Sequence, residues 1–253
     1  MRKIFWPILA LATLGTIRAA PSYLASGIVN AIDFSPGPFA PNSVVSIFGT
    51  NLSYATQASS VTAGDLPTEL GYTRVYVDQS LAPILYVSPG QINFLIPGNQ
   101  DVGDVKVRVY CQGVYGPEVV IQVKDAVPTL IPAGGGYVAA THADGSLITP
   151  DSPAHGGDPV VLYLTGLGKT SPSLGVTTIP KTPVWIVDFA DLKVLVAGTA
   201  VDSPRVFYAG LTPNFAGLYQ INWFLPDVVS ADPEIRVAVG PQVSTAGTKL
   251  AVK

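Results

Sequence analysis

The chain has 253 residues and a formal net charge of −3; hydrophobic residues make up 48% of it and charged residues only 12%. This apolar content excludes an intrinsically disordered chain, and the 25 Gly and 23 Pro exclude long helices, so the composition predicts an all-β protein rich in turns. The few Lys and Arg are scattered singly, which excludes the basic surface that nucleic-acid binding requires.

The N-terminal segment has the pattern of an export signal. Arg2 and Lys3 precede an uncharged run over residues 4–17, and the small residues Ala19 and Ala20 follow it. The run of 14 residues is shorter than the ~20 apolar residues of a membrane-spanning helix, so it predicts a cleaved signal peptide over residues 1–20. No later stretch has spanning length. We therefore expect a secreted or cell-surface protein without a stable membrane span after cleavage.

Residues 21–126 have the pattern of short strands separated by turns. The segments 74–78, 105–109 and 119–124 alternate Val or Ile with mostly polar residues. A period of two indicates antiparallel strands with one covered face, and about seven such runs predict a two-sheet, immunoglobulin-like sandwich. Cys111, the one cysteine, continues the apolar face of 105–109. This position favours a buried, inert thiol over a reactive or intermolecular one.

The domain boundary falls in a stretch rich in Pro and Gly between Val127 and Pro159. A division near residue 127 gives two predicted domains, residues 21–126 and 127–253. The Gly triplet at 134–136 and the acidic turn at 144–146 then open the second domain, where they should form a hairpin or an extended loop.

Strings from the first domain recur in the second domain in the same order. QINFLIP from Gln91 recurs as QINWFLP from Gln220, PNSVVSIFGTNL from Pro41 matches GDPVVLYLTGLG from Gly157, VYVDQSLAPILYVSPG from Val75 matches VLVAGTAVDSPRVFYAG from Val194, and VKVRV from Val105 matches IRVAV from Ile235. An insertion, TPNFAGLY, lengthens the loop before the second Gln-Ile-Asn. These matches predict a tandem of two immunoglobulin-like antiparallel β-sandwiches related by internal duplication.

Several long strings also carry a family resemblance. They are VVSIFGTNL, LPTELG, LYVSPGQINFLIP, DGSLITPDSPA, VVLYLTGLG, FYAGLTPNFAGLYQINWFLP and VSTAGTKLAVK. With them the chain resembles the duplicated, uncharacterised C-terminal module of exported Acidobacteria proteins, the Solibacter C-terminal domain. IFGTNL, a Gly-Thr-Asn turn after a strand, also resembles the opening of IPT/TIG immunoglobulin-like domains. The resemblance implies the fold and an extracytoplasmic location, and it implies no catalytic residues.

Both histidines lie in one segment that also contains three aspartates. The segment holds His142, Asp144, Asp151, His155 and Asp158. Such side chains bind divalent metals, but their spacing follows no metal motif, and the Asp-Gly and Gly-Asp pairs suit turns. The sequence therefore favours a solvated loop over a metal site.

Two Gln-Ile-Asn segments place paired amides on one face of a strand. These amides belong to Gln91, Asn93, Gln220 and Asn222. Such groups bind sugars or peptides, but a pair that occurs in both copies is better explained by something each fold needs. We expect the amides to satisfy backbone groups of the adjoining loop.

Aromatic residues gather around the inserted loop of the second domain. They are Trp185, Tyr208, Phe215, Tyr219 and Trp223. Their pattern favours core packing, and the alternative is a platform on which sugar rings stack.

The sequence contains no recognisable catalytic constellation. There is no G-x-S-x-G elbow, no phosphate-binding glycine loop and no recognisable pair of carboxylates. We therefore expect a non-enzymatic, exported structural, adhesion or interaction module that needs no cofactor and contacts an extracellular protein or glycan. The alternative is a carbohydrate-binding accessory module that uses the aromatic residues of the second domain.

Overall fold

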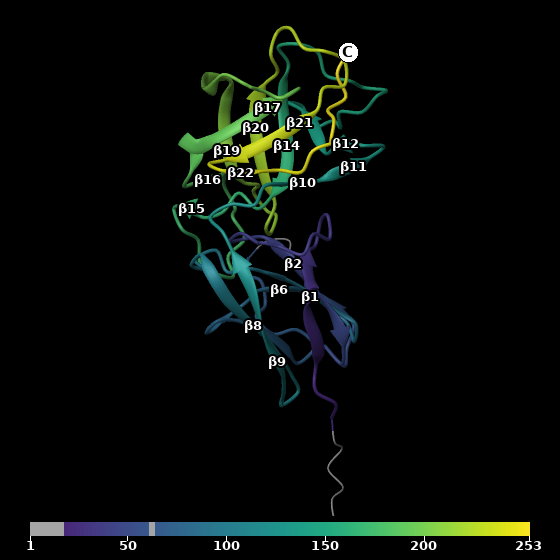
Figure 1. Cartoon of the computed structure of the whole chain (residues 1–253), viewed down its shortest axis with the longest axis vertical. Coiled ribbons are helices and arrows are strands. Elements are labelled where there is room, and N and C mark those ends of the chain that lie inside the picture. The colour runs from purple at the N-terminus through teal and green to yellow at the C-terminus, as the bar shows by residue number, and fades with distance from the viewer. Residues whose placement is uncertain (1–17, 61–63) are drawn as a thin grey trace, which may run out of the picture.

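The protein is built almost wholly of β-strands, as its composition predicts. A computed structural model describes residues 18–60 and 64–253. Its only helices there are two 3₁₀ turns, η1 (Phe189–Asp191) and η2 (Ser203–Arg205), and none of these residues forms a helix long and apolar enough to cross a membrane. Most of the predicted signal segment, residues 1–17, lies outside the described residues. Figure 1 shows two sandwiches stacked along the long axis, with the first strand and the C-terminus at opposite ends.

The first sandwich consists of two antiparallel sheets. The larger sheet has the order β1-β2-β7-β6-β3, with β1 (Ser22–Asn30), β2 (Val44–Thr50), β7 (Gln91–Leu95), β6 (Ile84–Val87) and β3 (Gln57–Ala58). The smaller sheet has the order β5-β4-β8-β9, with β5 (Ser80–Leu81), β4 (Thr73–Val77), β8 (Gly103–Cys111) and β9 (Val114–Val123).

The second sandwich has the same arrangement with extra short strands. Its larger sheet has the order β10-β14-β20-β19-β16-β15, with β10 (Thr129–Leu130), β14 (Pro159–Thr165), β20 (Tyr219–Phe224), β19 (Val206–Leu211), β16 (Val184–Ile186) and β15 (Thr170–Ser171), and β13 (Ala140–His142) also pairs with β14. The smaller sheet has the order β18-β17-β21-β22, with β18 (Thr199–Ala200), β17 (Leu192–Val196), β21 (Ile235–Val239) and β22 (Gln242–Val243). The Gly triplet forms the predicted hairpin, between β11 (Pro132–Gly134) and β12 (Tyr137–Val138).

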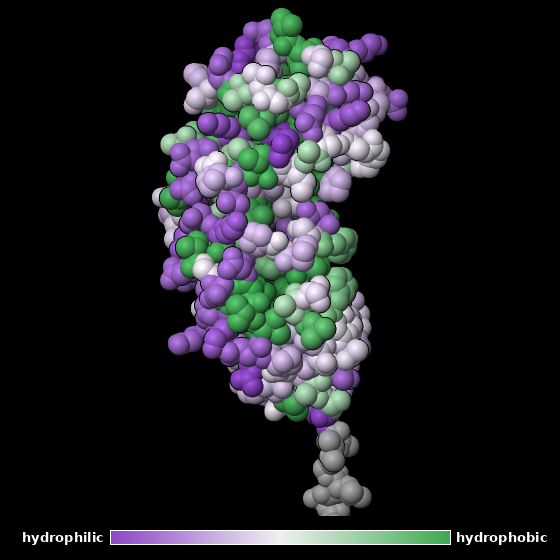
Figure 2. Space-filling view, in the orientation of Figure 1, coloured by the Kyte–Doolittle hydropathy of each residue, from purple (hydrophilic) through white to green (hydrophobic). Residues whose placement is uncertain are grey.

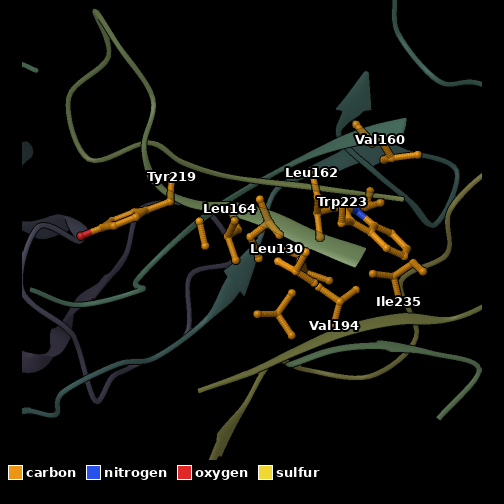
Figure 3. Packing of buried hydrophobic residues seen from close by; sticks show 14 of the residues in the cluster. Leu130, Val160, Leu162, Leu164, Val194, Tyr219, Trp223 and Ile235 are labelled. Carbon is orange, nitrogen blue, oxygen red and sulfur yellow. The ribbon is translucent and has the colours of Figure 1, made fainter. Parts of the chain in front are cut away.

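Each sandwich has its own hydrophobic core between its two sheets. Along β8 every second side chain from Val105 to Cys111 is buried, while Lys106 and Arg108 are exposed, as the period of two predicts. The thiol of Cys111 is buried, which confirms its predicted environment. In the second core, shown in Figure 3, Trp223 points between the sheets toward Ile235.

The two sandwiches agree in register as well as in strand order. In both, a β-bulge interrupts the pairing with the Gln-Ile-Asn strand, between Ile84 and Tyr86 in β6 and between Val206 and Tyr208 in β19. Val77 pairs with Ser80 across the short turn of the first sandwich, and Val196 pairs with Thr199 across the equivalent turn of the second. The common frame therefore extends to individual residue pairs.

In two of the repeated sequence strings, strand pairing shows that the equivalent residues are offset from those aligned by sequence. Val45 pairs with Phe94, and Val160 pairs with Trp223, so Val45 rather than Val44 is equivalent to Val160. With this shift of one residue, the left-handed Asn51 (φ 56°) is equivalent to Gly166 (φ 79°). A shift of two residues likewise makes Val107, the partner of Val77, equivalent to Ile235, the partner of Val196. Alternating strings align equally well at neighbouring offsets, and only strand pairing selects among them.

The TPNFAGLY insertion of the second sandwich packs on the first. A Cβ at Gly217 would lie 2.8 Å from Asn42 O and 2.7 Å from Leu95 Cδ2, so only Gly allows this approach. An apolar cluster closes the junction, formed by the buried Leu66, Leu95 and Ile179 together with Val44, Leu85 and Ala216. A backbone hydrogen bond from Leu66 N to Thr177 O (2.7 Å) adds a bridge between loops of the two sandwiches.

Candidate ligand-binding face

Three of the five aromatic residues that the sequence gathers are buried. Tyr219 and Trp223 are fully buried, and Tyr208 is only 6% exposed. A sugar ring must reach the face of an aromatic ring in order to stack on it, so these three side chains do not form a platform. Packing between the sheets, the role that the pattern favours, explains Trp223.

Tyr219 joins the two sandwiches. Its hydroxyl donates a hydrogen bond to Gly168 O and accepts one from Asn42 Nδ2 (3.1 Å), a residue of the first sandwich. In Figure 3 its ring points away from the centre of the core, and its hydroxyl lies toward the purple ribbon of the first sandwich. Burial raises the pKa of this phenol well above its usual value. The hydroxyl therefore stays protonated and keeps both hydrogen bonds.

Phe215 and Trp185 remain exposed but belong to separate neighbourhoods. Phe215 is 55% exposed on the inserted loop at the junction, and among the described residues its ring packs on no other aromatic ring. Trp185 is 42% exposed on β16, where it lies opposite Gly210 of β19. Only Trp185 is therefore part of an aromatic surface.

Two neighbouring rings and one glycine hold Trp185 in place. Its ring makes edge contacts with Phe189 and Tyr208, each with centroids 5.0 Å apart. The Tyr208 hydroxyl accepts a hydrogen bond from Val184 N (3.0 Å) and donates one to Leu211 O (2.8 Å), so it fixes β16 to β19. A Cβ at Gly210 would lie 2.0 Å from Val184 O. This glycine is therefore required for the close approach of the two strands.

The amide pairs bond to each other rather than to the adjoining loop, which corrects the predicted role. Gln220 Nε2 donates to Asn222 Oδ1 (3.0 Å), and in the first sandwich Gln91 Nε2 donates to Asn93 Oδ1 (2.8 Å). Gln220 and Asn222 are partly exposed. Within the described residues, Gln220 Oε1 and Asn222 Nδ2 have no protein partner, so one acceptor and one donor are free.

Two phenylalanines that sequence reasoning missed extend this surface. Phe207 and Phe224 are 45% and 41% exposed, with ring centroids 5.1 Å apart. Gln220, Asn222 and Phe224 are at alternate positions of β20, so the sequence alone predicts that they lie on the same face of the strand. Phe207 is turned outward by the β-bulge of β19, for which the sequence gives no signal.

These side chains define what we call the Trp185 face, on the outer side of the larger sheet of the second sandwich. It consists of Trp185, Phe207, Gln220, Asn222 and Phe224. Flat apolar rings lie at its ends, and amides capable of both donating and accepting hydrogen bonds lie between them. None of the five side chains is charged, so the face suits a neutral ligand with hydroxyl groups.

The histidine and aspartate segment forms turns. Asp144 Oδ1 accepts hydrogen bonds from Ser146 N (2.9 Å) and Ser146 Oγ (2.6 Å), which lowers the pKa of this carboxyl. His155 N donates to Asp158 Oδ2 (2.8 Å), and His142 Nε2 lies 3.2 Å from Ser152 O. Asp151 is exposed in a neighbouring turn. Across residues 18–60 and 64–253, no three His, Cys, Asp or Glu side chains gather closely enough to hold a metal ion.

Comparison with known proteins identifies a domain family in the first sandwich. Residues 28–124, from within β1 to just past the end of β9, match the IPT/TIG domain. This segment contains IFGTNL, which carries the sequence resemblance to that family. The search of curated proteins found no match.

Several solved structures resemble the chain at low identity. The surface glycan-binding protein PbSGBP-B from Prevotella bryantii is 11% identical, with a TM-score of 0.29 over 90% of this chain and 41% of that one. The Bacteroides ovatus SGBP-B, solved with a mixed-linkage heptasaccharide, is 11% identical, with a TM-score of 0.33 over 85% and 42%. Domains 5–6 of the S-layer protein SbsC are 10% identical, with a TM-score of 0.28 over 92% and 98%.

This chain spans less than half the length of the two glycan-binding structures. With TM-scores of 0.28 to 0.33, these likenesses carry no argument about this chain. The chain is an all-β protein of antiparallel sheets, and residues 28–124 of its first sandwich match the IPT/TIG domain.

Proposed function

We propose that this chain is an exported, non-enzymatic interaction module that contacts a partner outside the cytoplasm. The observation that carries the proposal is the Trp185 face, an uncharged surface of exposed rings and free amide groups held on a stiff sheet. Such a surface has the means to bind a ligand and no group to transform it. The segment 1–20, with its basic start and apolar run, supports export.

The two sandwiches, residues 21–126 and 127–253, are in this proposal copies of one ancestral domain. Their matching strand order, bulges and turn positions support the duplication. The long strings shared with the exported Acidobacteria module support a common origin with that family. Fastened end to end, with β1 and the C-terminus at opposite ends, the pair would hold the Trp185 face at a fixed distance from the N-terminal end.

The ligand class that fits the Trp185 face best is a neutral glycan. Apolar faces of sugar rings stack on exposed aromatic rings, and sugar hydroxyls pair with groups that donate and accept hydrogen bonds. Trp185 is held by Phe189 and Tyr208, so its ring loses little conformational freedom when a ligand binds. This proposal keeps Trp185 from the aromatic set identified in the sequence, adds Phe207 and Phe224, and leaves Phe215 at the junction.

A binding experiment on residues 21–253 tests this function. We expect saturable binding to at least one neutral polysaccharide by calorimetry, and we expect Trp185→Ala to weaken it by about tenfold because a stacking surface is lost. Val228→Ala removes apolar surface from a residue that is 92% exposed outside the face, and this control should bind like the wild type.

The outcomes separate the two parts of the proposal. If no neutral polysaccharide binds but Trp185→Ala abolishes binding to a purified envelope protein, the module stands and the glycan is excluded. Turnover of any bound polysaccharide by the purified chain, measured as new reducing ends, would contradict the non-enzymatic assignment.

A further inference from the structure

The smaller sheet of the first sandwich exposes a cluster of tyrosine and arginine side chains. Tyr110 and Tyr115, on neighbouring strands, have centroids 4.9 Å apart, and Tyr76 lies 6.1 Å from Tyr115. Two guanidinium groups lie over these rings: Arg108 is 4.4 Å from the centroid of Tyr115, and Arg74 is 5.6 Å from that of Tyr110. These five residues form what we call the Tyr–Arg face.

A β-bulge in β9 brings Tyr115 onto this face. Tyr110 pairs with Tyr115, but Arg108 pairs with Glu118, so β9 carries one residue more than β8 between these pairs. Tyr23 of β1 completes the interrupted ladder, because its hydroxyl accepts a hydrogen bond from Val109 N (2.8 Å) and donates one to Pro117 O (2.6 Å). Bulges of this kind commonly redirect side chains beside functional sites.

One cation of the face has no anionic partner. Arg74 is paired with Glu69, and the nearby Lys106 is paired with Glu118 (2.8 Å). Arg108 donates only from Nε, to Gly116 O (3.2 Å), and no carboxylate among the described residues lies within ion-pair distance of it. Its two terminal nitrogens are therefore free for a carboxylate, which they bind in a bidentate manner.

The second sandwich shows that the frame does not require these side chains. By strand register, Tyr76, Tyr110 and Tyr115 are equivalent to Leu195, Ala238 and Val243. Arg236 occupies the place of Arg108, but its Nε and Nη2 both donate to Ser244 O (3.0 and 2.8 Å). The tyrosines and the free guanidinium are thus additions to a frame that folds without them.

We infer that the Tyr–Arg face binds a glycan that carries carboxylate groups, with a sugar ring against Tyr115 and a uronate carboxylate on Arg108. The flat rings favour a ring-shaped ligand over a bare anion, and the free guanidinium selects a carboxylate. Nucleic acid fits less well, because a phosphate backbone is bound by a row of unpaired cations and this face has one. This site is separate from the neutral Trp185 face and stands or falls independently of it.

Calorimetry of residues 21–253 with polygalacturonate tests the inference, with dextran, poly-L-glutamate and single-stranded DNA of similar length as comparisons. We expect polygalacturonate alone among the four to bind at this face, and more weakly at high salt. Arg108→Gln should weaken binding by about tenfold, and Tyr115→Ala by about fivefold. Lys193→Gln, which removes a cation at the place equivalent to Arg74 in the second sandwich, should leave affinity unchanged.

The variant Arg108→Lys tests whether binding depends on the planar shape of the guanidinium group or only on its positive charge. It keeps the positive charge but loses the planar, two-nitrogen contact, so binding should fall as with Arg108→Gln. Thermal unfolding of each variant checks that it folds. Absence of polygalacturonate binding, equal or tighter binding of poly-L-glutamate or DNA, or an equal loss with Lys193→Gln would each overturn the inference. Trp185→Ala should not change this binding, which distinguishes failure here from failure of the neutral-glycan proposal.

Discussion

In the first sandwich the smaller sheet carries the exposed Tyr115 beside the partly buried Tyr76 and Tyr110 on its outer face. In the second sandwich the equivalent sheet has aliphatic side chains at these places, and the exposed aromatic rings lie on the larger sheet. Both sandwiches keep the same bulge in the strand before Gln-Ile-Asn and the same bonded amide pair. The shared features lie in the strand pairing of the sheets. The differences lie on outer faces, where a side chain contributes little to folding and can contact a ligand.

A second difference concerns the partner of one backbone amide in the smaller sheet of each sandwich, at the equivalent residues Val109 and Val237. Val109 N donates to the hydroxyl of Tyr23, which comes from the other sheet, whereas the equivalent Val237 N donates to Ser244 Oγ (3.0 Å), just past the end of β22. The equivalent backbone N–H groups thus have different side-chain acceptors in the two sandwiches. A mutation in one sandwich can therefore be compared with the mutation at the equivalent position in the other.

The largest difference should appear at the left-handed turn after β2 and β14. Gly166→Asn places the residue of the first sandwich at the equivalent position in the second, where a Cβ would lie 2.0 Å from Val127 O. We expect unfolding free energy to fall by about 3 kcal/mol in urea titrations, because backbone would have to move. The reverse change, Asn51→Gly, should alter it by only a few tenths of a kcal/mol. Similar costs at both sites would contradict the assigned equivalence.

Tyr219→Phe should weaken the junction without disturbing the second core. It removes the hydrogen bonds that the hydroxyl makes with Gly168 O and Asn42 Nδ2. The direct bond from Asn42 Nδ2 to Gly168 O (3.3 Å) remains, so we expect a cost of about 1 kcal/mol. In calorimetry we expect the lower-melting sandwich to separate from the other as the contact between them weakens. A single transition that keeps its width and midpoint would show that the hydroxyl does not couple the sandwiches.

Tyr23→Phe should destabilise the first sandwich by about 1 kcal/mol, because Val109 N and Pro117 O lose their partner. Its effect should depend on pH. Burial raises the pKa of Tyr23 from 10.0 to about 12, so the folded chain holds this proton where the unfolded chain releases it. The contribution of this phenol to stability is therefore present in full below pH 10 and is lost as pH rises through about 12.

The variant tests this assignment of the alkaline loss. Tyr23→Phe should lose less stability between pH 10 and 12 than the wild type, and Tyr219, whose pKa is also raised, should account for part of what remains. Ser244→Ala removes the equivalent bond in the second sandwich without a titrating group. It should lower stability by a similar amount at all pH values. An unchanged alkaline slope in Tyr23→Phe would assign the loss elsewhere.

The sequence predicted the strands because burial of one face of a sheet imposes an alternation of apolar and polar residues. The alternation along 105–109 and the recurrence of Gln-Ile-Asn each reflect a covered face, and the structure has strands at both. Side-chain exposure in the second domain was less predictable. Tyr219 and Trp185 are both aromatic and near the insertion, but one is bonded to Asn42 across the junction and the other stands on an outer face.

The Tyr–Arg face was missed for a related reason. Tyr76, Arg108 and Tyr110 alternate with valines, a pattern that every solvated face of a sheet shares. What sets the face apart is the cross-strand position of Tyr115, which depends on a bulge and on the hydroxyl of Tyr23, 92 residues away in the chain. Contacts of this kind depend on register, and register is set by the whole sheet.

The smallest effect is expected at Cys111, where the two sandwiches have different side chains in the same buried position. Register makes it equivalent to Val239, and both side chains are buried in their cores. The hydroxyl of Thr73 lies 3.7 Å from the thiol but also donates toward Leu52 O (3.3 Å), so it keeps a partner when the sulfur is removed. Cys111→Val should therefore change the unfolding free energy by about 0.5 kcal/mol or less. In the wild type the thiol should react with a thiol reagent only after unfolding in guanidinium; rapid labelling of the native chain would show that this face of the core opens.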